Sequence, residues 1–114
     1  ALTGTYAPFS GRGELLPRGA VKPDLVAPGV GIVTTGLNGG TTRVSGTSFA
    51  TPVVTGSAAL LMEWGIVKGN DAFLYGEKVK AYLRRGAQKL PGFAEYPNPL
   101  TGYGALCVER SLPE

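Results

Sequence analysis

Hydroxyl side chains gather in one short segment, SGTSFATP at residues 45–52, and one of them is placed where a nucleophile could act. The segment opens a long run of small and apolar residues that predicts a helix, so Ser48 falls in the first helical turn. A first turn carries unpaired backbone N–H groups and the positive end of the helix dipole, and both stabilise negative charge. Ser48 is therefore a candidate nucleophile, and its own N–H is a candidate donor to the oxygen of an attacked carbonyl group.

The same residue types allow a second interpretation, in which the hydroxyl groups only cap the helix. Serine and threonine are preferred at helix starts because their side chains accept hydrogen bonds from first-turn N–H groups. Ser45, Thr47 and Ser48 could all serve in this way. Pro52 is tolerated near the start of a helix, and it leaves the carbonyl of Ser48 without its usual partner. The spacing alone leaves both roles open.

A catalytic serine also needs a general base, because an unassisted hydroxyl is a poor nucleophile at neutral pH. The sequence contains no histidine, which also excludes histidine metal ligands. Four carboxylates could be nominated as substitutes, and we expect surface or capping roles for them: Glu14, Asp24, Glu63 and Asp71. A base for Ser48 must therefore come from outside these residues.

Several elements must position Ser48. β-Branched residues at Ile32–Thr35 and Thr41–Ser45, joined by a turn with Asn-Gly, predict a hairpin before it. A helix is predicted over Thr47–Trp64, and its apolar or small residues on nearly every side indicate burial on all sides. Further elements are expected as follows: a strand at Tyr6–Ser10, a buried strand edge or its exit loop at Asp24–Ala27, an amphipathic helix carrying Val79, Tyr82, Leu83 and Leu90, and a closing strand or short helix at Tyr103–Val108.

Length and composition predict a single folding unit. The chain has 114 residues, 43% of them hydrophobic, which is enough for one modest core and too short for two domains.

The net charge is +3, and the basic residues between 78 and 89 predict the solvated face of a helix rather than a nucleic-acid surface. Cys107 is the single cysteine, so no intrachain disulfide forms and a partly buried apolar role is expected. We recognise neither a signal peptide nor a run of about 18 apolar residues.

Four segments, in order along the chain, resemble signatures of the subtilisin-like serine peptidases, or subtilases. SGTSFATP at 45–52 is similar to the sequence around the nucleophile of that family, and KPDLVAPGV at 22–30 is similar to a second family run. FSGRG at 9–13 and YGAL at 103–106 match two further elements. The matches together span nearly the whole chain.

The resemblance implies roles for individual residues. Ser48 corresponds to the catalytic serine, and its backbone N–H to one donor of the oxyanion hole. Gly46 would let the substrate backbone approach, and Thr47 would cap the helix. Phe49 takes the place often held by methionine and would shape the leaving-group side, with Pro52 following in the same signature.

The resemblance also implies an α/β fold. Residues 1–114 would be a single partial domain, the C-terminal portion of a three-layer subtilisin-like fold with a mainly parallel sheet and a central buried helix. The intact parent would be a serine endopeptidase that cleaves a polypeptide substrate through an acyl-enzyme on Ser48. The catalytic Asp and His and the oxyanion Asn would lie in the missing N-terminal part of the domain. The isolated chain should therefore be inactive, and it should self-associate through uncovered apolar surface.

Two other functions stay open. A pseudoprotease or regulatory binding domain could keep the fold without a working triad. A sedolisin-like serine-carboxyl peptidase uses a similar serine segment with glutamate as the base, although the run at 22–30 favours subtilases. We assign no metal ligand and no cofactor, with calcium possible in the intact parent, and we expect neither nucleic-acid nor membrane partners. The localisation is open, because any leader would lie outside these residues.

Overall fold

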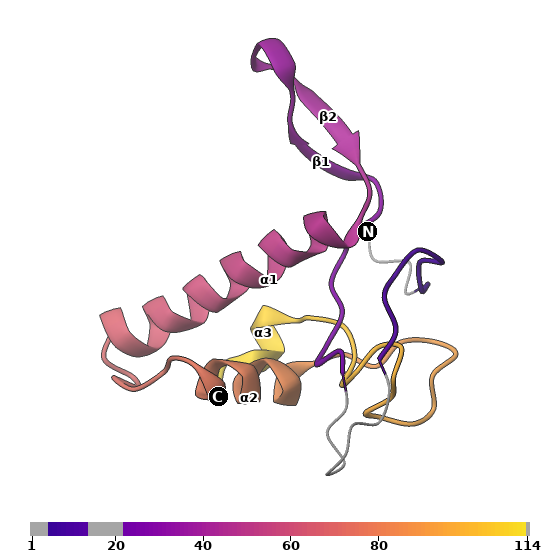
Figure 1. Ribbon diagram of the computed structural model, residues 1–114. Coiled ribbons are helices and arrows are strands. Elements are labelled where there is room, and N and C mark those ends of the chain that lie inside the picture. The colour runs from indigo at the N-terminus through magenta and orange to yellow at the C-terminus, as the bar shows by residue number, and fades with distance from the viewer. Residues whose placement is uncertain (1–4, 14–21, 114) are drawn as a thin grey trace.

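A computed structural model of the chain describes residues 5–13 and 22–113 (Figure 1). A hairpin projects from the start of a long helix, and two shorter helices lie beside that helix. The elements are β1 (Ile32–Thr35), a 3₁₀ turn (Leu37–Gly39), β2 (Thr41–Val44), α1 (Thr47–Met62), a π-helical turn (Glu63–Val67), α2 (Glu77–Gly86) and α3 (Val108–Ser111).

The predicted hairpin is confirmed. β1 and β2 pair in antiparallel register, with Ile32 opposite Val44 and Thr35 opposite Thr41. The chain reverses at Asn38, whose φ of 60° places it in the left-handed region that asparagine tolerates. β2 ends at Val44, one residue before the predicted end, because Gly31, the residue opposite Ser45, has a φ of 63° and is not extended.

The predicted long helix is confirmed as α1, which continues into the π-helical turn. Burial on all sides is not observed within this chain, since only Ser57 and Leu61 of α1 are buried. The stretch Thr47–Val67 has 21 residues and a mean hydropathy of 1.3, so by length and composition alone it could cross a membrane. The expectation that no such stretch exists was wrong. The central helix of a soluble domain has the same composition, so this finding is weak evidence for a span.

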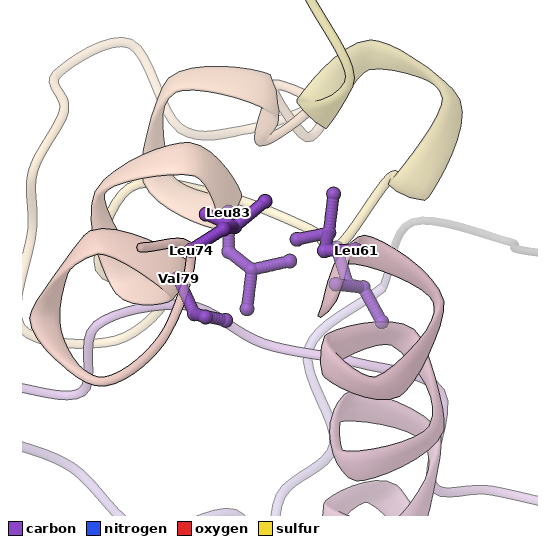
Figure 2. Close-up of a cluster of buried hydrophobic side chains, with 5 residues drawn as sticks. Leu61, Leu74, Val79 and Leu83 are labelled. Atoms are coloured by element: carbon purple, nitrogen blue, oxygen red, sulfur yellow. The ribbon is translucent and has the colours of Figure 1, made fainter. Parts of the chain in front are cut away.

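The core lies between the far end of α1 and α2. Figure 2 shows Leu61 of α1 facing Leu74, Val79 and Leu83. The predicted amphipathic helix is α2, which buries Val79 and Leu83 on one side, but the expectation that Leu90 belongs to it was wrong, because the helix ends at Gly86. Gly86, the last residue of α2, lies against α3, and a Cβ atom there would lie 2.4 Å from the backbone nitrogen of Ser111, so only glycine fits.

Isolated β-bridges at Ala105 connect the C-terminal segment to two earlier segments of the chain. Val26 pairs in parallel with Ala105, and Gln88 pairs with Ala105 in antiparallel fashion. The predicted strand edge at Asp24–Ala27 is therefore a single bridge, and the closing segment is a bridge followed by α3. In the described part, β1 and β2 form the one named sheet, and it is antiparallel. Helices and strands together fit an α/β fold, whereas a mainly parallel sheet is not established by this chain.

The strand expected at Tyr6–Ser10 was wrong, because these residues form a turn. The N–H of Ser10 donates to the carbonyl of Ala7 at 3.0 Å, and the Tyr6 hydroxyl donates to the carbonyl of Ser10 at 3.1 Å. Pro8 lies inside the turn and has no N–H to give to a ladder, so an extended pairing is disfavoured there.

Candidate functional site

Ser48 lies in the first turn of α1 and is exposed. Among residues 5–13 and 22–113, neither its hydroxyl nor its backbone N–H has a hydrogen-bond partner. A free hydroxyl beside a free first-turn N–H can attack a carbonyl carbon and donate to the oxygen that becomes negative. Both chemical features expected of a nucleophile are therefore accessible at one residue.

Glycines fix the approach to this turn. The N–H of Gly46 donates to the carbonyl of Gly29 at 2.7 Å. A Cβ atom at Gly29 would lie 2.9 Å from the Gly46 carbonyl oxygen and 3.2 Å from the Ala50 Cβ, so only glycine fits. Gly46 has a φ of 151°, which side chains disfavour. The segments at 22–30 and 45–52, which were separate in the sequence, thus meet at the start of α1.

The hairpin is joined to the same loop. The hydroxyl of Ser45 accepts a hydrogen bond from the N–H of Gly31 at 2.9 Å. The Arg43 Nη1 donates to the carbonyl of Gly31 at 3.2 Å. These contacts fix where β2 ends and α1 begins.

The expectation that Ser45 or Thr47 caps α1 was wrong. Gly46 is the N-cap residue and no side chain caps the helix. Ser45 lies one residue too early and bonds to Gly31 instead, while Thr47 is already the first helical residue. The first-turn N–H groups consequently stay available, which a capping hydroxyl would have prevented.

Phe49 and Pro52 shape the turn that follows. The Cδ2 atom of Phe49 lies 3.4 Å from the position that a Cβ would take at Gly46, so the ring lies beside this glycine. Pro52 lies inside α1 and has no N–H to pair with the carbonyl of Ser48. The hydroxyl of Thr51 bonds to the carbonyl of Thr47 at 3.1 Å and ties the first turn together.

In the part of the chain that the structure describes, Asp24, Glu63 and Asp71 make no hydrogen bond to Ser48. Asp71 accepts from the N–H of Phe73 at 3.1 Å, which confirms its capping role. The Lys78 ammonium, bonded to the same carboxylate, is the largest cause that holds the pKa of Asp71 below its usual value. Glu63 is exposed at the end of α1, and Glu14 lies outside the described residues.

Asp24 has a structural environment that the sequence did not indicate. It pairs with Lys22, Lys80 and Arg84 instead of lying free on the surface. Burial raises the pKa of this carboxyl, but the hydrogen bond from Lys22 and the charges of its three neighbours outweigh burial and lower the pKa overall. The expectation of a simple surface or capping role was therefore wrong for Asp24.

A wide cavity of about 830 Å³ opens beside the start of α1. Its walls come from the segments around 5–13 and 22–30 and from Ala50, Thr51 and Val54 of α1. In the described residues there is no group of three or more His, Cys, Asp or Glu that could hold a metal ion. Cys107 is partly buried, as its residue type predicts.

Comparison with known proteins identifies what this arrangement resembles. The family model described as the subtilase family matches residues 1–105. The chain is 37% identical to the membrane-bound transcription factor site-1 protease of Mus musculus, over 92% of this chain and 10% of that protein. It is 33% identical to the serine protease AprX of Bacillus subtilis strain 168, over 96% of this chain and 26% of that protein.

A solved structure gives the same result. The CspB protease of Clostridium perfringens superposes with a TM-score of 0.88 and is 50% identical, over 93% of this chain and 22% of that chain. This chain thus spans a minor part of the length of each of these relatives.

Proposed function

Because this chain belongs to the subtilase family, we propose that it is the nucleophile-bearing C-terminal part of a serine endopeptidase domain. The observation that carries the proposal is the exposed Ser48 in the first turn of α1, whose hydroxyl and N–H have no partner among the described residues. Related proteins are serine proteases that act on polypeptides, which fits this placement. Residues 1–114 would then be one partial domain, and its mainly parallel sheet would be completed by preceding residues.

The proposed reaction rests on the position of the serine and on the partners that the resemblance to subtilases implies. The Ser48 Oγ attacks the carbonyl carbon of a peptide bond while its proton passes to a histidine of the missing part. The Ser48 N–H and an asparagine amide of the missing part stabilise the resulting oxyanion. The proton then goes to the leaving amine, the C–N bond breaks, and water hydrolyses the acyl-enzyme. Gly46 would admit the substrate backbone, and Phe49 would border the leaving-group side.

The isolated chain should lack this activity. It has no histidine, and none of its described carboxylates contacts Ser48. The serine would therefore have no general base to accept its proton, and a serine hydroxyl without one is a weak nucleophile.

A pseudoprotease is the second candidate, because the loss of an upstream Asp or His would not be visible in these residues. The sedolisin alternative is disfavoured, since the match is to the subtilase family over residues 1–105.

A fluorophosphonate probe separates the two remaining candidates. We expect the probe to label Ser48 in the full-length parent and to leave the isolated 114-residue chain unlabelled, with peptide mapping by mass spectrometry as the measurement. A folded full-length protein without label at Ser48 would support the pseudoprotease. Labelling of the isolated chain at an equal rate would contradict the need for an upstream base.

We also expect the isolated chain to self-associate. Leu60 and Met62 of α1 are exposed, at 55% and 36%, as is Val30 at 63%. Apolar surface of this kind is normally covered by protein, and we propose that the missing part of the domain covers it in the parent. Size-exclusion chromatography with light scattering should show dimers or larger species that bind a hydrophobic dye. A monodisperse monomer that binds no dye would be the opposite result.

A further inference from the structure

We propose that Asp24 is a positioning residue for Ser48, because its carboxylate fixes residues 24–29 to α2 and these residues hold the first turn of α1. We call residues 24–29 the strap. The inference rests on the proposed function, since it concerns what places the nucleophile of that site. It is carried by the ion pairs at one end of the strap and the glycine contact at the other.

The first end of the strap is held by charge. The Asp24 Oδ1 lies 2.8 Å from the Arg84 Nη2, and its Oδ2 lies 2.6 Å from the Lys22 Nζ and 3.5 Å from the Lys80 Nζ. The Asp24 side chain is only 23% exposed. Charge-assisted hydrogen bonds that are partly shielded from water are stronger than ordinary surface pairs. Asp24 is thereby fixed to two residues of α2, Lys80 and Arg84.

Arg84 depends on the same carboxylate. Its guanidinium carbon lies 5.4 Å from the centre of the Tyr103 ring, so the group is held between an aromatic face and Asp24. Within the described part of the chain, the Arg84 Nε is buried and has no hydrogen-bond partner. Removal of the Asp24 charge would therefore leave a partly buried cation without its nearest anion, which is costly.

Backbone hydrogen bonds keep the strap extended. The N–H of Tyr103 donates to the carbonyl of Asp24 at 2.8 Å, and the N–H of Leu106 donates to the carbonyl of Val26 at 2.8 Å. The N–H of Val26 donates to the carbonyl of Gly104 at 2.9 Å. These three bonds attach the strap to residues 103–106, so it lies as one extended segment between Asp24 and Gly29.

The second end of the strap contacts α1 directly. The Gly29 carbonyl accepts from the Gly46 N–H, and Ser48 follows two residues later. The far end of α1 is held separately, by Leu61 against α2 (Figure 2). α2 thus determines the position of both ends of α1, through the core at one end and through Asp24 at the other. A misplacement of about 1 Å at a reacting group can lower a rate by about 10²-fold.

The test is Asp24→Asn in the full-length protein, which keeps the shape of the side chain and removes its charge. We expect kcat to fall by roughly ten- to a hundred-fold while KM changes by less than about two-fold. The fluorophosphonate probe should reach the same final labelling of Ser48 at a correspondingly lower rate. Asp24→Glu, which keeps the charge, should recover part of the rate.

Asp71→Asn is the matched control. Asp71 also pairs with a lysine of α2, at 15% side-chain exposure, but it lies beyond the far end of α1 and has no contact with the strap. We expect this variant to be less stable with an unchanged labelling rate per folded molecule. A purely structural role for Asp24 would lower the final labelling of both variants and leave both rates unchanged.

The labelling rates of the two variants distinguish a positioning role from a purely structural one. An unchanged rate in Asp24→Asn, or an equal slowing in Asp71→Asn, would overturn the positioning role. If Asp24→Asn does not fold, Arg84→Lys tests the same anchor, and an unchanged labelling rate in that variant would overturn the role as well. If the unmodified protein neither cleaves peptides nor labels at Ser48, the proposed function fails and the inference fails with it.

Discussion

Replacement of Ser48 by alanine in the full-length parent is expected to abolish peptide hydrolysis. The Oγ atom is the group that would form the acyl-enzyme, so this variant loses the nucleophile itself. The loss of a triad nucleophile lowers kcat by roughly 10⁶-fold, a figure measured in subtilisin, which belongs to the same family. The measurement is steady-state hydrolysis of a chromogenic peptide, together with fluorophosphonate labelling.

Thr55→Ala is the matched control for this variant. Thr55 is an exposed hydroxyl two turns further along α1, and it bonds only to the carbonyl of Thr51, at 3.1 Å. We expect its hydrolysis rate to stay within about two-fold of the parent, because surface changes away from special features have small effects. If Ser48→Ala retains more than a trace of activity while Thr55→Ala is normal, another residue is the nucleophile.

Leu61→Ala should be the substitution in α1 that most reduces stability. Leu61 is completely buried against Leu74, Val79 and Leu83 (Figure 2). Leucine-to-alanine changes at such positions cost about 2–5 kcal/mol, because transfer free energy is lost and a cavity remains. That is a large fraction of the stability of about 5–15 kcal/mol typical of a native protein. Urea denaturation followed by circular dichroism measures the change.

Leu60→Ala is the control for Leu61→Ala, because Leu60 is the neighbouring residue of the same helix and is exposed. Leu60 is 55% exposed in this chain, so its truncation should change the stability of the isolated chain by less than about 0.5 kcal/mol when measured at dilutions where the chain is monomeric. In the full-length parent the same change should cost more if the missing part of the domain covers this side of α1. Equal and small effects in both forms would show that this side of the helix stays uncovered.

Local patterns predicted the hairpin and the two main helices because each depends on contacts close in sequence. The Asn-Gly turn at residues 38–39 sets the hairpin, and the spacing of Val79 and Leu83 sets the buried side of α2. The boundaries were less predictable. Ser45 falls outside β2 because Gly31, the residue opposite it, has a φ of 63°, and Gly46, with a φ of 151°, is the N-cap of α1.

The exposure of α1 shows a second limit of local patterns. Its composition predicts burial on every side, and the structure of these residues buries only Ser57 and Leu61. The amino-acid composition of a helix shows how much apolar surface must be buried. It does not show whether the residues that bury this surface belong to the same 114 residues.

By itself the sequence determined the family, through four ordered segments, and the position of Ser48 at the start of an apolar helix. Only the tertiary structure decided that Gly29 meets Gly46, that the Ser48 hydroxyl stays unbonded, and that Asp24 pairs with residues of α2. The physical reason is the sequence separation over which each kind of interaction acts. Helix and turn preferences act over a few residues, whereas the contact between Asp24 and Arg84 joins groups 60 residues apart, and packing of the whole chain alone brings them together.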